Sequence, residues 1–203
     1  MLADTLGRLE GLAASKDAWV ITARDLHGAV REAAPHVPHA HVVGEPVGKN
    51  TAPAIALACW WLRGAGKETA VAVLPSDHRI EPAAQSREEL ERAARLALEQ
   101  RVIVTFGVPP TRPETGYGYI EGGDPIPSAP AFRAIPAFRE KPDLETAARY
   151  VGDGNHLWNA GMFVWRTEVF LAEAERNAPG LAKFIREFPS AHPAAAEREA
   201  AAD

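Results

Sequence analysis

Apolar residues follow two different spacings along this chain, and the two spacings alternate. Near the start, leucines recur at three- and four-residue steps that place them on one face of a helix: Leu2, Leu6, Leu9 and Leu12. Short apolar runs typical of buried strands follow, at residues 19–22, 41–44, 70–74 and 102–107. The run at 70–74 has no polar alternation, which predicts a strand that helices cover on both faces.

Helical segments lie between these runs, and two of them have recognisable beginnings. Asn50 and Thr51 are good cap residues for an apolar helix over 54–62, and Asp143 is one for a helix over 143–151. Further helices are predicted over 25–34, 83–100 and 168–176. In the 83–100 helix, the residues predicted to face the core are Leu90, Ala94, Leu96 and Ala97.

Strands that alternate with helices of this length predict an α/β fold, a Rossmann-like, mostly parallel sheet with helices on both faces. After Gly107, prolines and glycines predict a loop at the sheet edge, followed by strands at 119–121, 132–138 and 161–165. We expect one domain over residues 1–203, with an Ala- and Glu-rich tail over 194–203 that frays. Ligands of such sheets bind at the carboxyl ends of the strands.

Charge and composition exclude several classes of protein. The chain has 22 Lys and Arg against 27 Asp and Glu, a net charge of -5, which argues against a binder of nucleic acid. Cys59 is the single cysteine and cannot form an internal disulfide, and the start of the chain does not resemble a secretion signal. The longest apolar run, 52–62, is too short to span a bilayer. We therefore expect a cytoplasmic protein.

Asp77 is the first candidate for chemistry, because it follows the apolar run at 70–74 almost directly. A carboxylate at the carboxyl end of a strand can hold a divalent cation that faces bound phosphates. The alternative is that Asp77 only stabilises a turn together with Pro75 and Ser76.

Four separated segments carry a resemblance to a known family. They are Glu45-Pro46 with Lys49-Asn50-Thr51-Ala52-Pro53-Ala54, then Leu74-Pro75-Ser76-Asp77-His78, then Glu114-Thr115-Gly116-Tyr117-Gly118-Tyr119-Ile120, and finally Glu140-Lys141-Pro142 with Trp158-Asn159-Ala160-Gly161-Met162-Phe163. In this order and spacing, over residues 42–166, they resemble the bacterial mannose-1-phosphate guanylyltransferases, which are sugar nucleotidylyltransferases.

The resemblance implies that the first segment contacts the guanine and ribose of a nucleotide, through Glu45, Lys49, Asn50, Thr51, Ala52 and Pro53. Backbone groups and short polar side chains suit the recognition of a base edge. A simple helix cap would explain Asn50 and Thr51 but would not explain Lys49. The resemblance also makes Asp77 a catalytic residue and a ligand of Mg²⁺, which would neutralise phosphate charge.

The resemblance places the sugar at the later segments, with Tyr117, Gly118, Glu140, Asn159 and Gly161 as its contacts. Gly118 would let backbone amides approach a hydroxyl closely, and Glu140 would accept hydrogen bonds from mannose hydroxyls. Lys141 would act in catalysis as a compact positive charge for the sugar phosphate. The alternatives are a bare hairpin turn at 116–118 and a solvated ion pair between Glu140 and Lys141.

The implied reaction transfers a GMP moiety from GTP to mannose 1-phosphate, gives GDP-mannose and pyrophosphate, and uses Mg²⁺ as cofactor. The expected partners are GTP and mannose 1-phosphate, or GDP-mannose. Neither nucleic acid nor a membrane is expected, and a homo-oligomer is left open.

The chain departs from the family at both ends. The family opens with a strand and a Gly-rich loop that cradles the triphosphate, and neither precedes Leu2. It also continues beyond residue 203 to a second aspartate that shares the metal. We therefore expect no GDP-mannose formation by this chain, whether it is a fragment, a misread start or a natural short form.

Two other functions stay open. The chain could be a non-catalytic sugar-nucleotide-binding or regulatory relative of the enzyme. The chain could also be a glycosyltransferase that uses nucleotide sugars. Such enzymes usually need an Asp-x-Asp metal motif, which Ser76-Asp77-His78 does not provide.

Histidines and the cysteine have simpler interpretations than chemistry. His36, His39 and His41 are closely spaced but lie in a proline-broken loop without a recognisable metal-ligand pattern, so metal binding there is the less favoured interpretation. Cys59 lies on an apolar helix and is predicted to be a core thiol. The chain contains no Gly-x-Ser-x-Gly, so acyl hydrolysis has no support.

Overall fold

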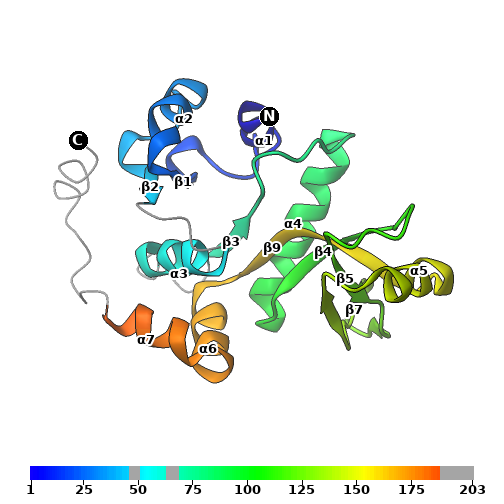
Figure 1. Ribbon diagram of the computed structural model, residues 1–203. Helices are drawn as coiled ribbons and strands as arrows, with labels where there is room; N and C mark the ends of the chain where they lie inside the picture. Colours follow the sequence, from blue (N-terminus) through cyan, green and yellow to red (C-terminus); the bar gives the residue numbers. More distant parts are fainter. Residues whose placement is uncertain (46–50, 63–68, 188–203) are drawn as a thin grey trace. The chain divides into compact units, whose positions relative to one another are not determined.

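The computed structural model describes residues 1–45, 51–62 and 69–187 (Figure 1). The chain divides into two compact units, the first made of Met1–Ile103 with Val164–Asp203 and the second of Val104–Phe163. The expected α/β class is confirmed, because each unit combines strands with helices. The predicted tail over 194–203 lies outside the described residues.

The first unit holds most of the helices. They are α1 (Leu2–Gly7), α2 (His27–Ala33), α3 (Thr51–Leu62), α4 (Ala83–Gln100), α6 (Thr167–Asn177) and α7 (Pro179–Glu187), with short 3₁₀ turns η1 (Ser15–Asp17), η2 (Arg24–Leu26) and η3 (His39–His41). Its strands are β1 (Val20–Ala23), β2 (Val42–Glu45) and β3 (Ala70–Val73). β1 and β2 pair in parallel, with Val20 opposite Val42, and α2 connects them. This is the predicted strand-helix-strand arrangement.

The first helix is shorter than its leucine pattern predicts. Leu2 and Leu6 do pack against a buried cluster formed by Ala34, Val37 and Val42. The helix ends at Gly7, however, and the chain turns at Gly11, whose φ of 86° lies in the left-handed region. Leu12 is therefore exposed, and the predicted helical face ends before it.

Helices α3 and α4 of this unit bury most of the residues expected to lie in the core. α4 has the predicted bounds and buries Leu90, Leu96 and Ala97 as predicted, but it buries Ser86 and Ala93 as well and leaves Ala94 half-buried. In α3, Cys59 is fully buried, and burial raises the pKa of its thiol to about 11. The prediction that Cys59 is a core thiol is confirmed.

Strand β3 differs from the prediction. It pairs with β9 (His156–Arg166), the long strand that ends in this unit. Only Val71 of β3 is buried and Ala72 is exposed, so helices do not cover both faces of this strand. A run of small apolar residues predicts a strand but does not show how much of it the fold covers.

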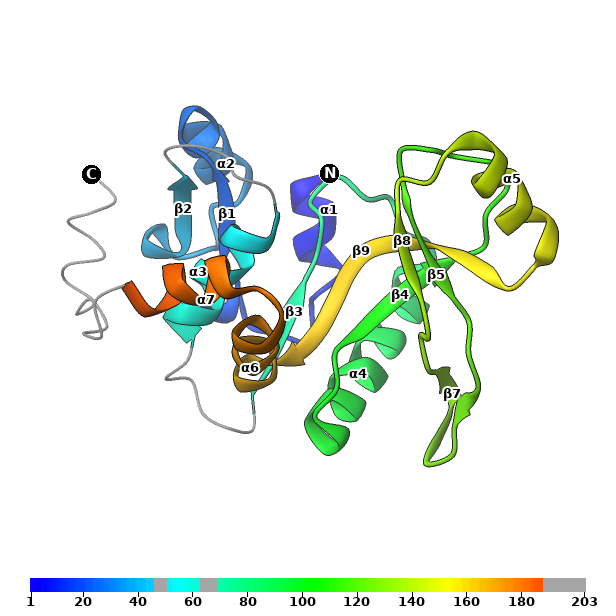
Figure 2. The ribbon, with the colours of Figure 1, turned by 60° about the horizontal axis from the view of Figure 1, so that its bottom comes forward.

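The second unit is built around strands (Figure 2). They are β4 (Val104–Val108), β5 (Gly118–Glu121), β6 (Pro125–Ile126), β7 (Ala129–Arg133), β8 (Phe138–Glu140) and the first part of β9, with one helix, α5 (Leu144–Asp153). β5 lies between β8 and β9, β4 also pairs with β9, and β6 and β7 form a separate antiparallel hairpin. Tyr119 of β5 is fully buried, next to the buried Ile120.

Strand pairing in the second unit shows where parallel pairing ends. β5 runs antiparallel to both β8 and β9, so the parallel pairing of β1 and β2 does not extend to these strands. The single strand predicted over 132–138 is wrong: β7 ends at Arg133 and β8 begins at Phe138. Pro136 lies between them, where it cannot donate to a strand ladder.

No helix in the part of the chain that the structure describes is both long enough and apolar enough to cross a bilayer.

Gly161 provides the first test of the fold, because it lies inside β9 with a φ of 67°. An L-residue in this left-handed region costs about 1–2 kcal/mol, so Gly161→Ala is expected to lower the free energy of unfolding by about that amount. The matched control is Gly152→Ala in α5, where an added Cβ meets nothing within 4 Å and which should raise stability slightly. Urea unfolding followed by circular dichroism measures both, and equal effects of the two substitutions would contradict the strand geometry.

Asp143 provides a second test, because its Oδ1 accepts a hydrogen bond of 2.8 Å from the backbone N–H of Thr146 and caps α5 as predicted. This backbone hydrogen bond lowers the pKa of Asp143 below its ordinary value of 3.8. Its contribution to stability is therefore fully present above the unfolded pKa and is lost as pH falls through the lower folded pKa.

The Asp143→Asn variant keeps an N-cap acceptor but cannot be protonated in this range. We expect similar melting temperatures for the two proteins at neutral pH. Below about pH 4, the wild type should lose stability relative to the variant. Thermal unfolding across this pH range is the measurement, and parallel pH profiles would show that the cap does not carry the effect.

Candidate functional site

The predicted sugar contacts of the second unit gather where β8, β5 and β9 lie side by side. Gly118 pairs directly with Glu140 across β5 and β8. A Cβ atom added at Gly118 would come within 2.7 Å of Glu140 Oε2 and 2.8 Å of Phe138 Cζ. Only glycine therefore leaves room for the Glu140 carboxylate to lie against the β5 backbone.

Asn159 joins this group from the third strand. Tyr119 pairs with Trp158 across β5 and β9, and Gly118 and Asn159 are the next residues on either side of that antiparallel pair. Glu140, Gly118 and Asn159 thus occupy neighbouring positions on three adjacent strands. A carboxylate and a side-chain amide lie there on either side of a backbone without a side chain, which is a polar surface suited to hydroxyl groups.

The loop before β5 is held by Glu114, a residue to which sequence reasoning assigned no role. Its carboxylate accepts hydrogen bonds of 3.1 Å from the Gly116 N–H and from Arg112 Nη2, and its own N–H donates to Tyr119 Oη at 3.0 Å. The Gly116 N–H, and then Arg112, lower the pKa of Glu114. The loop is therefore ordered by its own residues, and the signal in the sequence was the Glu-x-Gly spacing.

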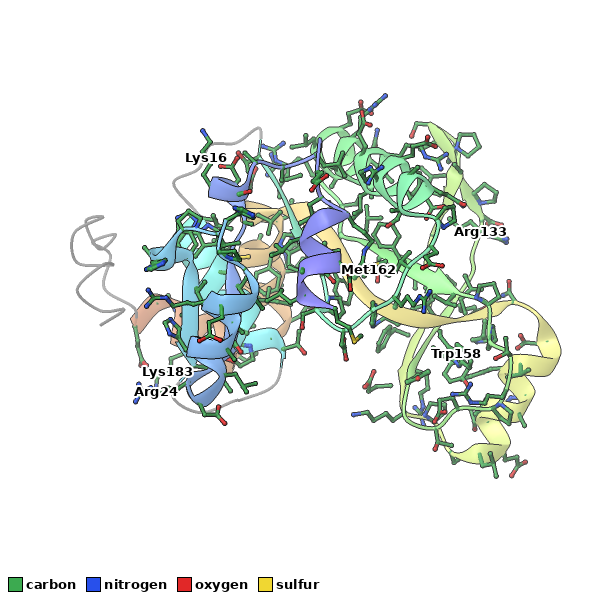
Figure 3. The ribbon with its side chains drawn as sticks, turned by 90° about the horizontal axis from the view of Figure 1, so that it is seen from above. Lys16, Arg24, Arg133, Trp158, Met162 and Lys183 are labelled. Carbon is green, nitrogen blue, oxygen red and sulfur yellow. The ribbon has the colours of Figure 1, made fainter. Side chains whose placement is uncertain are left out.

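Aromatic side chains border the same strands. Tyr117 is 45% exposed and meets the Trp158 ring edge-on at a centroid distance of 5.3 Å. The Arg112 guanidinium lies 5.5 Å from the centre of the Trp158 ring. Trp158, labelled in Figure 3, has a buried indole N–H that finds no acceptor in the described residues. An exposed tyrosine supported by a tryptophan can pack against the apolar face of a sugar ring.

Lys141 has an unusual backbone conformation. Its φ of 45° is in the left-handed region, immediately before Pro142, and its N–H donates to the Tyr117 carbonyl at 3.2 Å. Its Nζ lies 3.7 Å from Glu140 Oε1, with both side chains more than half exposed, so the ion pair left open by the sequence does form. Non-glycine residues in this region cost about 1–3 kcal/mol and concentrate at functional sites.

Thr105 of β4 contacts the side chain of Asn159 in β9. Its Oγ1 lies 2.8 Å from Asn159 Oδ1 and 2.8 Å from the Met162 carbonyl oxygen. Sequence reasoning did not identify Thr105, because it lies 54 residues from Asn159 and in a segment outside the four motifs. Gly161, which has a left-handed φ, lies in β9 between Asn159 and Met162.

The predicted nucleotide and metal residues belong to the first unit. Asp77 is exposed in the turn after β3, and the Ser76 carbonyl accepts a hydrogen bond of 3.3 Å from Thr5 Oγ1. Thr5 in turn accepts one of 2.8 Å from the buried Arg8. Glu45 ends β2, and Thr51, Ala52 and Pro53 open α3. Lys49 and Asn50 lie outside the described residues.

Metal ligands are sparse among the residues with a described position, which contain no group of three His, Cys, Asp or Glu side chains able to hold a metal ion. His39 contacts Arg31, and His41 Nδ1 lies 3.2 Å from the Ala18 carbonyl oxygen, so these rings have other partners. Asp77 makes no ion pair within the described ranges. A single open carboxylate is compatible with Mg²⁺, which is commonly held by one or two carboxylates together with water and phosphate oxygens.

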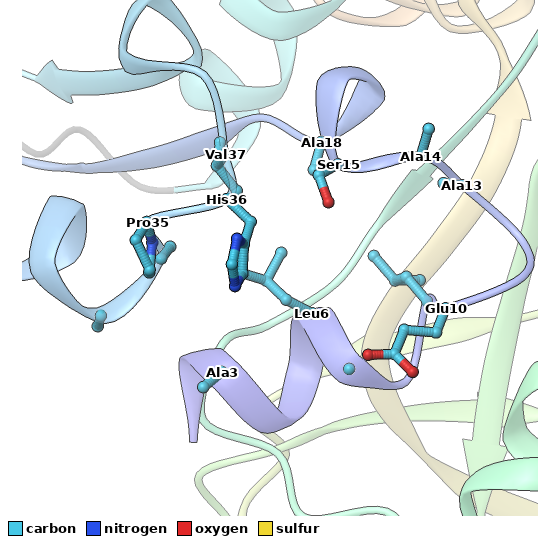
Figure 4. Close-up of a pocket in the computed structure, with 14 residues that line it drawn as sticks. Ala3, Leu6, Glu10, Ala13, Ala14, Ser15, Ala18, Pro35, His36 and Val37 are labelled. Carbon is cyan, nitrogen blue, oxygen red and sulfur yellow. The ribbon is translucent and has the colours of Figure 1, made fainter.

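A cavity of about 170 Å³ lies elsewhere in the first unit, between α1 and the segment after α2 (Figure 4). Its lining is mostly apolar, with Glu10, Ser15 and His36 as its polar members. None of the residues predicted from the sequence to contact nucleotide, sugar or metal lines it. The cavity therefore does not mark the candidate site.

Comparison with known proteins connects this geometry to a family. The sequence model of the family described as nucleotidyl transferase matches residues 2–201. The xanthan biosynthesis protein XanB of Xanthomonas campestris pv. campestris (strain B100) is 44% identical over 138 residues, which are 68% of this chain and 28% of that protein. A mannose-1-phosphate guanylyltransferase of Salmonella montevideo is 43% identical over 137 residues, 65% of this chain and 28% of that protein.

A solved structure has the same fold. It is a Thermus thermophilus protein described as a mannose-1-phosphate geranyltransferase, with a TM-score of 0.83 and 28% sequence identity. The superposition covers 98% of this chain and 57% of that one. This chain spans 28% of the length of the two relatives named above. Because the family match runs over nearly the whole sequence, the chain belongs to the nucleotidyl transferase family.

Proposed function

We propose that this chain binds a sugar nucleotide and takes part in the transfer of GMP from GTP to mannose 1-phosphate. The observation that carries the proposal is the row of Glu140, Gly118 and Asn159 on three adjacent strands, bordered by an ordered loop. Family membership and the name of the Salmonella montevideo relative support the reaction class and the sugar.

Recognition of the sugar follows from the groups in this row. The Glu140 carboxylate, more than half exposed, can accept hydrogen bonds from two hydroxyl groups. Gly118 keeps that carboxylate close to the strand backbone, and Tyr117 offers an exposed ring for the apolar face of the sugar. A ligand with several adjacent hydroxyl groups matches this surface better than an apolar one does.

Lys141 has the charge for the sugar phosphate. Its ammonium is exposed and, among the residues that the structure describes, forms a single, long ion pair with Glu140, so it can turn towards a phosphate at little cost. Its backbone is held by the hydrogen bond to Tyr117, which ties the position of the lysine to the loop that borders the sugar. Lys141 would orient and partly neutralise the attacking phosphate.

The nucleotide belongs, in this proposal, to Glu45, Lys49, Asn50, Thr51, Ala52 and Pro53, and Asp77 would hold Mg²⁺. When bound, the ion would neutralise charge on the phosphates. A phosphate oxygen of mannose 1-phosphate attacks the α-phosphorus of GTP, the new P–O bond forms GDP-mannose, and pyrophosphate leaves. No covalent enzyme intermediate is needed, because the attacking phosphate is already an anion. Free GTP and sugar phosphate are cytoplasmic metabolites, so we place this function in the cytoplasm.

The second candidate function is a sugar-nucleotide-binding relative that does not turn over. It uses the same row of residues, so binding and turnover must be measured separately. Pyrophosphate release from GTP, mannose 1-phosphate and Mg²⁺ would support the transferase and would contradict the expectation that this chain forms no GDP-mannose. Saturable binding of GDP-mannose without pyrophosphate release would support the binding relative, and the absence of both would contradict the proposal.

Glu140→Ala tests the sugar contact. Because hydrogen bonds to a charged group contribute about 1.5–3 kcal/mol, we expect the dissociation constant for GDP-mannose to rise by tenfold or more. Titration calorimetry gives this constant, and Glu145→Ala, which removes an exposed carboxylate from the first turn of α5, is the control for charge. If both variants bind as tightly as the wild type, Glu140 does not contact the ligand.

Gly118→Ala tests the close approach of β5 and β8. The added methyl group meets the ends of two exposed side chains, Glu140 and Phe138, which can move aside without unfolding the strand. We expect weaker GDP-mannose binding with a nearly unchanged melting temperature. Gly116→Ala is the matched control, because a Cβ there meets only Glu114 Oε1, at 3.4 Å. Equal affinities of Gly118→Ala and Gly116→Ala for GDP-mannose would show that the sugar does not bind at the row of Glu140, Gly118 and Asn159.

A further inference from the structure

The hydroxyl of Thr105 lies between two oxygen atoms. Thr105 Oγ1 is 2.8 Å from Asn159 Oδ1 and 2.8 Å from the Met162 carbonyl oxygen, and both separations are hydrogen-bond distances. A hydroxyl has one proton and can donate to only one of these acceptors. With Asn159 Oδ1 towards Thr105, one of the two contacts would bring oxygen atoms together without a proton between them.

The side-chain amide of Asn159 resolves this conflict by its orientation. The Met162 main-chain carbonyl can only accept, so it takes the Thr105 proton. The oxygen and nitrogen of an asparagine amide are nearly the same size and exchange places when the amide turns over. With Nδ2 towards Thr105, the amide donates to Oγ1, Oγ1 donates to the Met162 carbonyl, and every contact has its proton.

We propose that Thr105 is a positioning residue that turns the Asn159 amide so that its carbonyl oxygen, and not its nitrogen, faces the ligand. Asn159 is only half-buried, and in the described part of the chain Thr105 is the sole hydrogen-bond partner of its side chain. The outward atom is therefore available to a bound molecule. The consequence for ligands rests on the proposed function, whereas the orientation of the amide does not.

The orientation sets the kind of ligand group that the row accepts. Glu140, on the other side of Gly118, can only accept hydrogen bonds when ionised. With Asn159 Oδ1 outward, both polar side chains of the row are acceptors. The site then selects two ligand hydroxyl groups that act as donors, and it disfavours ligand groups that can only accept.

Thr105→Val and Thr105→Ser separate the hydroxyl from the shape of the side chain. Valine keeps the volume of the side chain but removes the hydroxyl that bonds to Asn159 and to the Met162 carbonyl, whereas serine keeps this hydroxyl. Thr22→Val in β1 is the matched control, because the same substitution there, again on a strand, removes no hydrogen bond of the described residues.

Nuclear magnetic resonance of nitrogen-labelled full-length chain tests the amide directly. The Asn159 side-chain signal is assigned by its loss in Asn159→Asp. In the wild type, we expect one Nδ2 proton of Asn159 to exchange with water several-fold more slowly than the side-chain protons of exposed asparagines. This slow exchange should remain in Thr105→Ser and Thr22→Val and should be lost in Thr105→Val. An Nδ2 group that exchanges freely in the wild type and does not change in Thr105→Val would overturn the proposed orientation.

Binding of sugar phosphates tests the selection of donors. The probes are mannose 1-phosphate and analogues in which one hydroxyl at a time is replaced by fluorine, which cannot donate. The same analogue series measured with Glu140→Ala identifies the hydroxyl group that Glu140 contacts. At one other position, the fluorine should weaken binding to the wild type about tenfold and weaken binding to Thr105→Val clearly less. Equal losses in both proteins at every position would overturn the selective role.

The two experiments keep the two proposals apart. A wild type that binds no sugar phosphate would contradict the proposed function and, with it, the role of Asn159 in selecting hydroxyl donors. The exchange measurement would still decide the orientation of the amide, since it needs no ligand.

Discussion

The candidate site depends on the close approach of β5 to β8 at Gly118. With no side chain at this position, the Glu140 carboxylate and the Phe138 ring lie against the β5 backbone, at distances that no Cβ would allow. Because β5 also pairs with β9, the same glycine lies between Glu140 on one side and Asn159 on the other. The absence of a side chain at Gly118 therefore allows the polar groups of three strands to lie next to one another.

The residues around this row are held by local hydrogen bonds more than by burial. Glu114 closes the loop before β5 through Gly116 and Arg112, and Tyr119, the fully buried residue of β5, accepts the Glu114 N–H. Lys141 is tied to the same loop through the Tyr117 carbonyl and has a left-handed backbone. A site ordered before ligand arrives loses less conformational entropy on binding, which is the advantage of building it on strands and a closed loop.

The first unit presents its candidate residues differently. Asp77 lies exposed just past β3, in a turn whose Ser76 carbonyl is bonded to the buried Thr5 and Arg8 pair. An exposed carboxylate on an anchored turn is free to accept a cation. The family match over residues 2–201 spans the candidate residues of both units.

Sequence by itself determined the family and several of the elements. The bounds of α4, the Asp143 cap, the burial of Cys59 and the parallel β1–β2 pair follow from periodicity, capping chemistry and apolar runs, which are local properties of the chain. The motifs around Gly118, Glu140 and Asn159 identified the family because their residues and order are readable in one dimension.

Only the tertiary structure decided which residues meet. The antiparallel pairing of β5 and the contact between Thr105 and Asn159 depend on strand register and on distances between residues far apart in sequence. The exposure of Ala72 was likewise decided by what the rest of the fold leaves uncovered. Spacing along the chain contains no information about such contacts, because a hydrogen bond depends on the positions of both partners in space.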